Sequence, residues 1–134
     1  MAKELTLEAA ERVIEAAKKR AQEIATPMSI SVVDSGANLV AFARMDDALL
    51  VATEVAQAKA ETAVGFKTAT RDLTGAVQPG APLYGIEAIG RGRLAFFGGG
   101  VPLYEGGRVV GAVGVSGGSV EQDEDVAAAG AAAF

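Results

Sequence analysis

The sequence contains no cysteine, no histidine and no tryptophan. Without cysteine there is no disulfide framework, and a reducing cytoplasm is the compartment that we expect. Without histidine and cysteine, the chain lacks most of the side chains that bind transition metals or act as catalytic bases and nucleophiles. We therefore predict no metal site.

Positive charge and long apolar runs are also scarce. With 17 acidic and 12 basic residues, the formal net charge is −5, whereas nucleic-acid binding calls for a clustered basic face. No uncharged apolar run approaches the ~18–20 residues of a membrane span, and the charged, amphipathic N-terminus does not resemble a signal peptide. We expect neither nucleic acid nor a membrane as partner. The length of 134 residues suits one domain, residues 1–134.

The first third of the chain predicts a helix followed by a β-hairpin. Apolar residues at spacings of three and four mark one helix face over residues 7–24, and Thr6 is its expected N-cap. Alternation over residues 28–33 predicts a strand. Turn residues at 34–38 then lead into a returning strand over 39–45.

The remaining pattern predicts a second helix, a long irregular segment, three strands and a last helix. The second helix, over residues 49–68, has an apolar face made mostly of alanine, with Asp46 or Asp47 as its expected cap. Long irregular segments such as 71–92 are frequently functional lids. The three strands are expected at 94–97, 101–105 and 108–115, and the last helix at Ser119. Hairpins with helices segregated around them predict an α+β fold.

A capping-box pattern occurs at Ser119-Val120-Glu121-Gln122, which predicts a helix start. Anion binding by Gly117, Gly118 and the helix N-terminus is the functional alternative. Four acidic side chains in the first two turns would repel a phosphate. A neutral carbonyl or hydroxyl group could still meet these amides.

The other glycine-rich stretches match no phosphate-binding motif. No Gly-Lys-Ser/Thr follows the glycines at 98–100, so they are not a P-loop. For Gly99 and Gly100, close packing and a backbone left bare for a ligand are both open interpretations. For Gly111 and Gly114, which lie within a strand, we favour packing against a helix.

The main polar group comprises Arg44, Asp46 and Lys59. Arg44 leaves the second strand, and Asp46 begins the helix that carries Lys59. A salt-bridged corner is one interpretation, and the other is a ligand-facing pair in which Arg44 or Lys59 holds a carboxylate. For Tyr84 and Tyr104 we favour core packing with an exposed hydroxyl group over a role in a pocket.

Together these segments resemble the GlcG/HbpS-like heme-binding protein family, which also supplies the C-terminal domain of PduO-type adenosyltransferases. The resemblance covers nearly the whole chain in order. The matching segments are Met28-Ser-Ile-Ser-Val-Val-Asp34 with Gly36, Arg44-Met45-Asp46, Ala58-Lys59-Ala60-Glu61-Thr62-Ala63, Gly99-Gly100-Val101-Pro102-Leu103, residues 106–118, Glu121-Gln122-Asp123 and residues 127–130.

The resemblance implies a profilin-like sheet of five antiparallel strands flanked by helices, assembled as a homo-oligomer. It also implies heme or tetrapyrrole binding for some members, whereas others are encoded beside catabolic genes. This chain departs from the heme-binding pattern because it has no histidine or cysteine as axial ligand. The remaining candidate ligands are Met28, Met45, Tyr84, Tyr104, a lysine or a threonine, and both methionines lie on predicted strands, where core packing is the default.

Two functions from different classes follow. In the first, the protein holds heme, another tetrapyrrole or an aromatic metabolite between the sheet, the second helix and segment 71–92. In the second, it is a cofactor-independent isomerase or lyase, with Arg44 or Lys59 holding a carboxylate and backbone amides stabilising an enolate. The candidate ligand-binding residues are Arg44, Asp46, Lys59, Gly99, Gly100, Ser116, Gly117 and Gly118.

Overall fold

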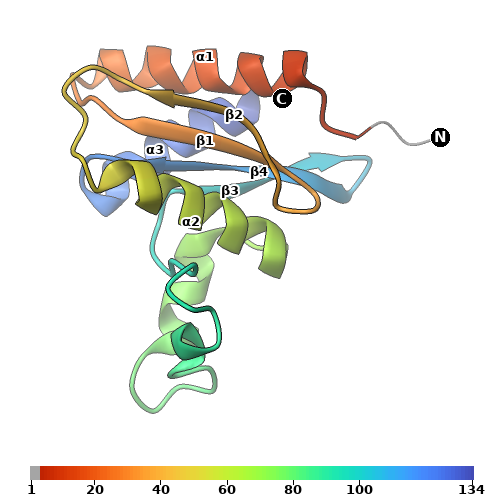
Figure 1. Cartoon of the computed structure of the whole chain (residues 1–134), viewed down its shortest axis with the longest axis vertical. Coiled ribbons are helices and arrows are strands. Elements are labelled where there is room, and N and C mark those ends of the chain that lie inside the picture. The colour runs from red at the N-terminus through yellow and green to blue at the C-terminus, as the bar shows by residue number, and fades with distance from the viewer. Residues whose placement is uncertain (1–3) are drawn as a thin grey trace.

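The computed structural model describes residues 4–134 and contains one antiparallel sheet with the strand order β2-β1-β4-β3 (Figure 1). The predicted α+β class is confirmed. The elements are α1 (Leu7–Glu23), β1 (Ser29–Asp34), β2 (Leu39–Arg44), α2 (Ala52–Phe66), the 3-10 helices η1 (Thr70–Val77) and η2 (Ile86–Ala88), β3 (Gly100–Glu105), β4 (Arg108–Ser116) and α3 (Val120–Ala132). None of the helices within residues 4–134 has both the length and the apolar character needed to cross a bilayer.

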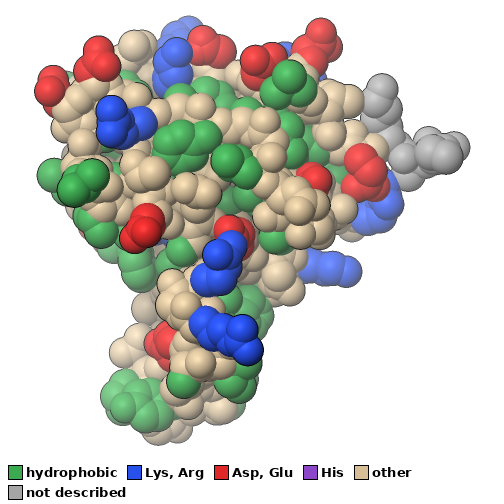
Figure 2. Space-filling view, in the orientation of Figure 1, with side chains coloured by type: hydrophobic (Ala, Val, Ile, Leu, Met, Phe, Trp, Pro, Cys, Tyr) green, Lys and Arg blue, Asp and Glu red, His purple; other side chains and the backbone are tan. Residues whose placement is uncertain are grey.

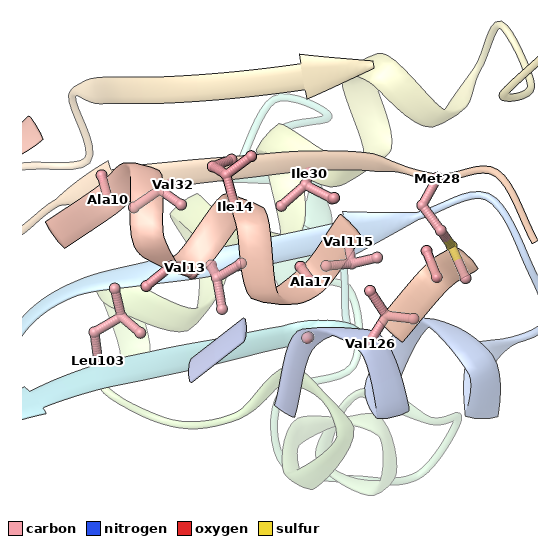
Figure 3. Close-up of a cluster of buried hydrophobic side chains, with 13 residues drawn as sticks. Ala10, Val13, Ile14, Ala17, Met28, Ile30, Val32, Leu103, Val115 and Val126 are labelled. Atoms are coloured by element: carbon pink, nitrogen blue, oxygen red, sulfur yellow. The ribbon is translucent and has the colours of Figure 1, made fainter. Parts of the chain in front are cut away.

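The helices cover both faces of the sheet. Helices α1 and α3 pack together on one face, and α2 lies on the other (Figure 1). The larger core forms on the α1 and α3 side, where Met28, just before β1, and Ile30 and Val32 of β1 point toward the helices, as their alternation predicted (Figure 3). All three side chains are completely buried.

Helix α2 lies unusually close to β4 because glycine provides the space. A Cβ atom at Gly114 would collide with the backbone of Ala56 and Ala60 in α2. A Cβ atom at Gly111 would meet the carbonyl group of Val33 in the neighbouring strand. The contacts of Gly114 confirm packing against a helix, whereas Gly111 packs closely against the neighbouring strand β1.

The sheet has four strands rather than the expected five, because residues 94–97 do not form a strand. Threonine side chains bind the backbone of this segment in place of a neighbouring strand. Thr62 accepts a hydrogen bond from the Ala95 N–H at 2.9 Å, and Thr70 donates to the Phe97 carbonyl at 2.7 Å. With its polar groups satisfied in this way, the segment lies beside α2 and outside the sheet.

Helix α2 begins later than predicted and without the expected aspartate cap. Its N-cap is Val51, which makes no side-chain capping bond. Asp46 and Asp47 lie instead in an exposed turn after β2, and Asp47 has a left-handed backbone with φ of 70°. The turn places both carboxylates outside the first turn of α2, which explains why neither caps it.

Residues 70–97 form a lobe that projects away from the sheet (Figure 1). The lobe has a small core of its own in which Leu73, Val77 and Phe96 are buried, and Phe66 at the end of α2 packs against it. The Phe66 and Phe96 rings meet edge to face with centroids 5.7 Å apart. The segment expected to close over a pocket therefore stands clear of the sheet.

Candidate functional site

A buried ion pair joins Lys59 in α2 to Asp123 in the first turn of α3. Lys59 Nζ lies 2.7 Å from Asp123 Oδ2 and donates a second hydrogen bond, at 2.9 Å, to the Val115 carbonyl. The Lys59 residue has no exposed surface, and Asp123 is 3% exposed. The Phe97 ring covers the ammonium group, whose nitrogen is 4.9 Å from the ring centroid.

The backbone amides around this pair already have acceptors. The Gly118 N–H donates to Asp123 Oδ1 at 2.9 Å, and the Gly99 N–H donates to Glu124 Oε1 at 3.0 Å. The Gly100 N–H donates to the Thr70 hydroxyl oxygen at 2.9 Å. In this arrangement the amides bind the protein's own acceptors, so none of these three is free to stabilise an enolate.

Burial shifts the protonation equilibria of the cluster. It lowers the pKa of Lys59, and the ion pair with Asp123 opposes that shift. It raises the pKa of Asp123, against the effect of Lys59 and the hydrogen bonds from Gly118 and Gly117. It also raises the pKa of Glu124, which lies beside the Gly99 amide and 3.6 Å from the Arg71 guanidinium group.

The structure brings six of the eight predicted ligand-binding residues to one place. They are Lys59, Gly99, Gly100, Ser116, Gly117 and Gly118. A Cβ atom at Gly99 would lie 2.6 Å from Lys59 Nζ, and one at Gly100 would lie 2.5 Å from the Lys59 carbonyl oxygen. Close packing around the buried lysine thus accounts for the missing side chains. As a ligand site, the cluster stays a prediction.

Arg44 and Asp46 lie elsewhere, in a surface depression of about 430 Å³ between α1 and the end of β2. Lys18 and Gln22 of α1 line its other side. The predicted salt-bridged corner with Lys59 is therefore wrong, because Lys59 points into the protein toward Asp123. Arg44 itself is exposed.

Asp123 and Glu124 were missed as members of this cluster, although the sequence carries a signal for Asp123. In α3 the buried residues Asp123, Val126, Ala127 and Gly130 recur at helical spacing. Lys59 likewise falls among the buried alanines of α2. A lysine and an aspartate on the apolar faces of two helices are expected to form an ion pair, because burying an unpaired charge is strongly unfavourable.

Both tyrosines are more exposed than predicted. Tyr84 is 65% exposed and Tyr104 is 54% exposed, so neither packs into a core. Tyr84 lies at the lobe tip, beside a depression of about 280 Å³ that is otherwise lined by Pro82, Leu83, Gly85, Ile86 and Ile89. Tyr104 lies beside a larger depression of about 700 Å³, whose lining includes the charged Glu4, Glu8, Arg12 and Glu105.

The two methionines considered as iron ligands, Met28 and Met45, pack in or against the core, as predicted. Met28 is completely buried in the larger core. Met45 packs against that core, and its sulfur accepts a hydrogen bond from the Met28 N–H at 3.4 Å. Of the four methionine and tyrosine side chains considered as iron ligands, the two tyrosines are therefore the more accessible to a bound ligand.

The lobe tip carries residue types that heme-binding sites use. Tyrosinate oxygen is an established axial ligand of heme iron, and Tyr84 lines its depression together with apolar side chains that suit a macrocycle face. Hydrophobic side chains gather at the end of the lobe and basic ones lie along its side (Figure 2). The basic side chains could pair with carboxylate groups of a ligand.

Comparisons with known proteins place the chain among relatives along almost its whole length. The matching family model is described as "Haem degrading protein HbpS-like" and covers residues 5–132. The chain is 48% identical over 130 residues to the corrinoid adenosyltransferase PduO of Citrobacter freundii, a match that covers 97% of this chain and 39% of that protein. The chain therefore spans about two fifths of the length of that relative.

A shorter relative matches over most of both chains. It is a 15.0 kDa uncharacterised protein of the dhaT-dhaS intergenic region in Citrobacter freundii, 46% identical over 119 residues, or 89% of this chain and 84% of its own. Among solved structures, one described as the PduOC:heme complex superimposes with a TM-score of 0.95 and 45% identity, covering 98% of this chain and 96% of that one.

Proposed function

The chain belongs to the family of haem-degrading HbpS-like proteins, and we propose that it binds a small molecule: heme, another tetrapyrrole or an aromatic metabolite. One observation carries the proposal: the close match, in both sequence and fold, to the PduOC structure in complex with heme. We further propose that the protein acts in the cytoplasm as a homo-oligomer.

We place the ligand at the lobe tip, on the side chains around Tyr84. The Tyr84 oxygen would bind the iron, and Leu83, Ile86 and Ile89 would cover one face of the ring system. Arg91, which is exposed and near the lobe tip in sequence, would pair with a ligand carboxylate. When bound, heme would supply an iron centre that can change oxidation state, while Tyr84 and its apolar neighbours would orient it.

Two other locations follow from the sequence. Arg44 and Asp46 remain proposed contacts for a carboxylate or a hydroxyl group in the α1/β2 depression. The cluster of Lys59 with Gly99, Gly100, Ser116, Gly117 and Gly118 would bind a ligand only after Asp123 and Glu124 release the amides. The lobe tip needs no such rearrangement, which favours it.

A heme titration followed by absorbance tests the proposal. Hemin is added to the purified protein in steps, and the Soret band is compared with that of hemin added to a protein of similar size that binds no heme. We expect a shifted band that saturates at a defined stoichiometry. A Soret band that matches the control at every step would contradict heme binding. Protoporphyrin without iron, followed by fluorescence, then separates ring binding from iron ligation.

A further inference from the structure

The open edge of β2 is the least protected strand edge in the sheet. Within the described residues, β2 pairs only with β1 on its inner side. The segment Leu-Val-Ala-Phe-Ala contains no proline and no charge before Arg44. The other edge strand, β3, carries Pro102, which discourages edge pairing because proline has no N–H to donate. The register of β2 itself shifts at Val40, so the regular part of its open edge is residues 41–44.

The hydrogen-bond pattern shows which β2 groups face outward. The Met45 N–H donates to the Met28 carbonyl of β1 at 3.0 Å. In an antiparallel ladder the inward groups alternate with outward ones. Ala43 therefore pairs inward, whereas Phe42 and Arg44 direct their N–H and C=O groups to the open side. These groups form a template for one more antiparallel strand.

A groove runs beside this edge, between α1 and β2. One part, of about 420 Å³, is lined by Glu11, Ile14 and Glu15 of α1 together with Ala41 and Phe42. The second part, of about 430 Å³, is the depression already described, lined by Lys18 and Gln22 of α1 and by residues 43–46. Helix and strand thus run in the same direction along the groove.

The two ends of the groove carry opposite charge. The end that begins with Glu11 and Glu15 is acidic, whereas the other end has two cations, Lys18 and Arg44, and one carboxylate, Asp46. Lys18 also pairs with Glu15 of its own chain at 2.9 Å. If a two-fold axis related two copies whose β2 strands lie side by side, the two grooves would run in opposite directions. The acidic end of each groove would then face the basic end of the other. This self-complementarity is what a two-fold contact between identical chains requires.

We propose that β2 pairs antiparallel with β2 of a second copy of this chain, so that two four-stranded sheets join into one. The contact uses the outward groups of Phe42 and Arg44 in the strands, and the facing charges of the α1/β2 grooves steer the two copies into register. The inference rests on the proposed homo-oligomer and specifies its surface. It does not depend on heme.

Engineered cysteines test the pairing directly, because the chain has no other thiol. The symmetric pair of the two strands would be centred on residue 42 or residue 43, so Phe42→Cys and Ala43→Cys are each made alone. We expect one of them to form a disulfide-linked dimer on mild oxidation, because paired strands bring Cα atoms within disulfide range. Ile89→Cys, at the 81% exposed lobe tip, is the matched control and should stay monomeric on non-reducing gels.

Charge reversal gives a second, independent readout. Arg44→Glu should weaken the dimer by about tenfold in sedimentation experiments, because the change occurs twice in a two-fold interface. Adding Glu15→Lys to that variant should restore much of the affinity. Circular dichroism and thermal melting identify any variant that fails to fold, and the cysteine variants then decide the question.

The outcomes distinguish failure of the β2 contact from failure of the proposed homo-oligomer. A wild-type protein that stays monomeric at all concentrations would overturn both the homo-oligomer and the β2 contact. An oligomer in which neither Phe42→Cys nor Ala43→Cys crosslinks would leave the oligomer standing and overturn the β2 pairing.

Discussion

Lys59 and Asp123 lie 64 positions apart in sequence, yet their side chains meet at 2.7 Å in a site closed to solvent. The contact joins the middle of α2 to the first turn of α3 at the end of β4. It also places Asp123 where the Gly118 amide can donate to its second oxygen. The Asp123 carboxylate therefore makes two contacts. One oxygen binds a lysine from the opposite face of the sheet, and the other accepts a hydrogen bond from the backbone just before its own helix.

Removing one partner of this ion pair should destabilise the protein strongly. Lys59→Met leaves the Asp123 carboxylate buried without its cation, and such changes cost about 3–5 kcal/mol. The double variant Lys59→Met with Asp123→Asn should cost clearly less than the sum of the two single variants, because no uncompensated charge remains. Urea unfolding of all three variants measures the coupling. Strictly additive losses would contradict a direct interaction.

Gly114→Ala should destabilise the protein by about 1–3 kcal/mol or more, because its new methyl group overpacks the interface between β4 and α2. The backbone atoms of Ala56 and Ala60 that it would meet cannot rotate away. Gly65→Ala in the exposed part of α2 is the matched control, since open space surrounds that position. We expect Gly65→Ala to stabilise by about 0.5–1 kcal/mol. Equal thermal shifts for the two variants would argue against the close packing.

Two neighbouring carboxylates should respond to pH with opposite sign. The hydrogen bond and charge of Arg20 lower the pKa of Asp125 below its ordinary 3.8, so the folded protein binds fewer protons there than the unfolded chain. Its contribution is present above that ordinary value and is lost as pH falls through the lower folded value. Burial raises the pKa of Glu124 above 4.5, so stability falls as pH rises from 4.5 through the folded value.

Carbon-detected NMR titration of the two side chains measures both directions, and unfolding at several pH values measures their effect. Asp125→Asn should remove the loss of stability below pH 3.8, and Glu124→Gln should remove the loss above pH 4.5. Titration of both carboxyl groups at their ordinary values would contradict the contacts with Arg20 and the burial of Glu124.

Tyr84→Phe should abolish the shifted Soret band if the lobe tip holds heme, because it removes only the oxygen that binds iron. Tyr104→Phe is the matched control, since Tyr104 is similarly exposed but lies among charged groups. The control should leave the spectrum unchanged. If Tyr104→Phe alone abolishes the shift, the ligand lies in the depression beside the α1 start and not at the lobe tip.

Local patterns predicted much of the fold. The capping box at Ser119 forms with both of its hydrogen bonds, and Thr6 caps α1 as its position indicated. Asp34 binds the turn amides of Gly36 and Asn38, both at 2.9 Å. These features depend on groups within a few residues of one another, so a linear sequence contains the information.

The errors arose where contacts connect distant segments. Residues 94–97 have the composition of a strand, but their backbone is hydrogen-bonded to the hydroxyl groups of Thr62 and Thr70 and not to a neighbouring strand. Segment 71–92 was expected over a pocket, and its apolar side chains instead pack among themselves and against Phe66 to form the lobe. Neither outcome follows from local propensity, because both depend on contacts between side chains of α2 and residues that come much later in the sequence.

The sequence by itself determined the α+β class, the hairpins, the N-caps of α1 and α3 and the family, since short-range hydrogen bonding and periodic burial specify them. It also showed that histidine and cysteine are unavailable to bind iron. Only the tertiary structure decided that Lys59 is bound by Asp123, that the glycine amides have acceptors, and that Tyr84 is exposed at the end of a lobe. The reason is physical: a charge on a helix face can be buried or exposed, and its partner from another element decides which.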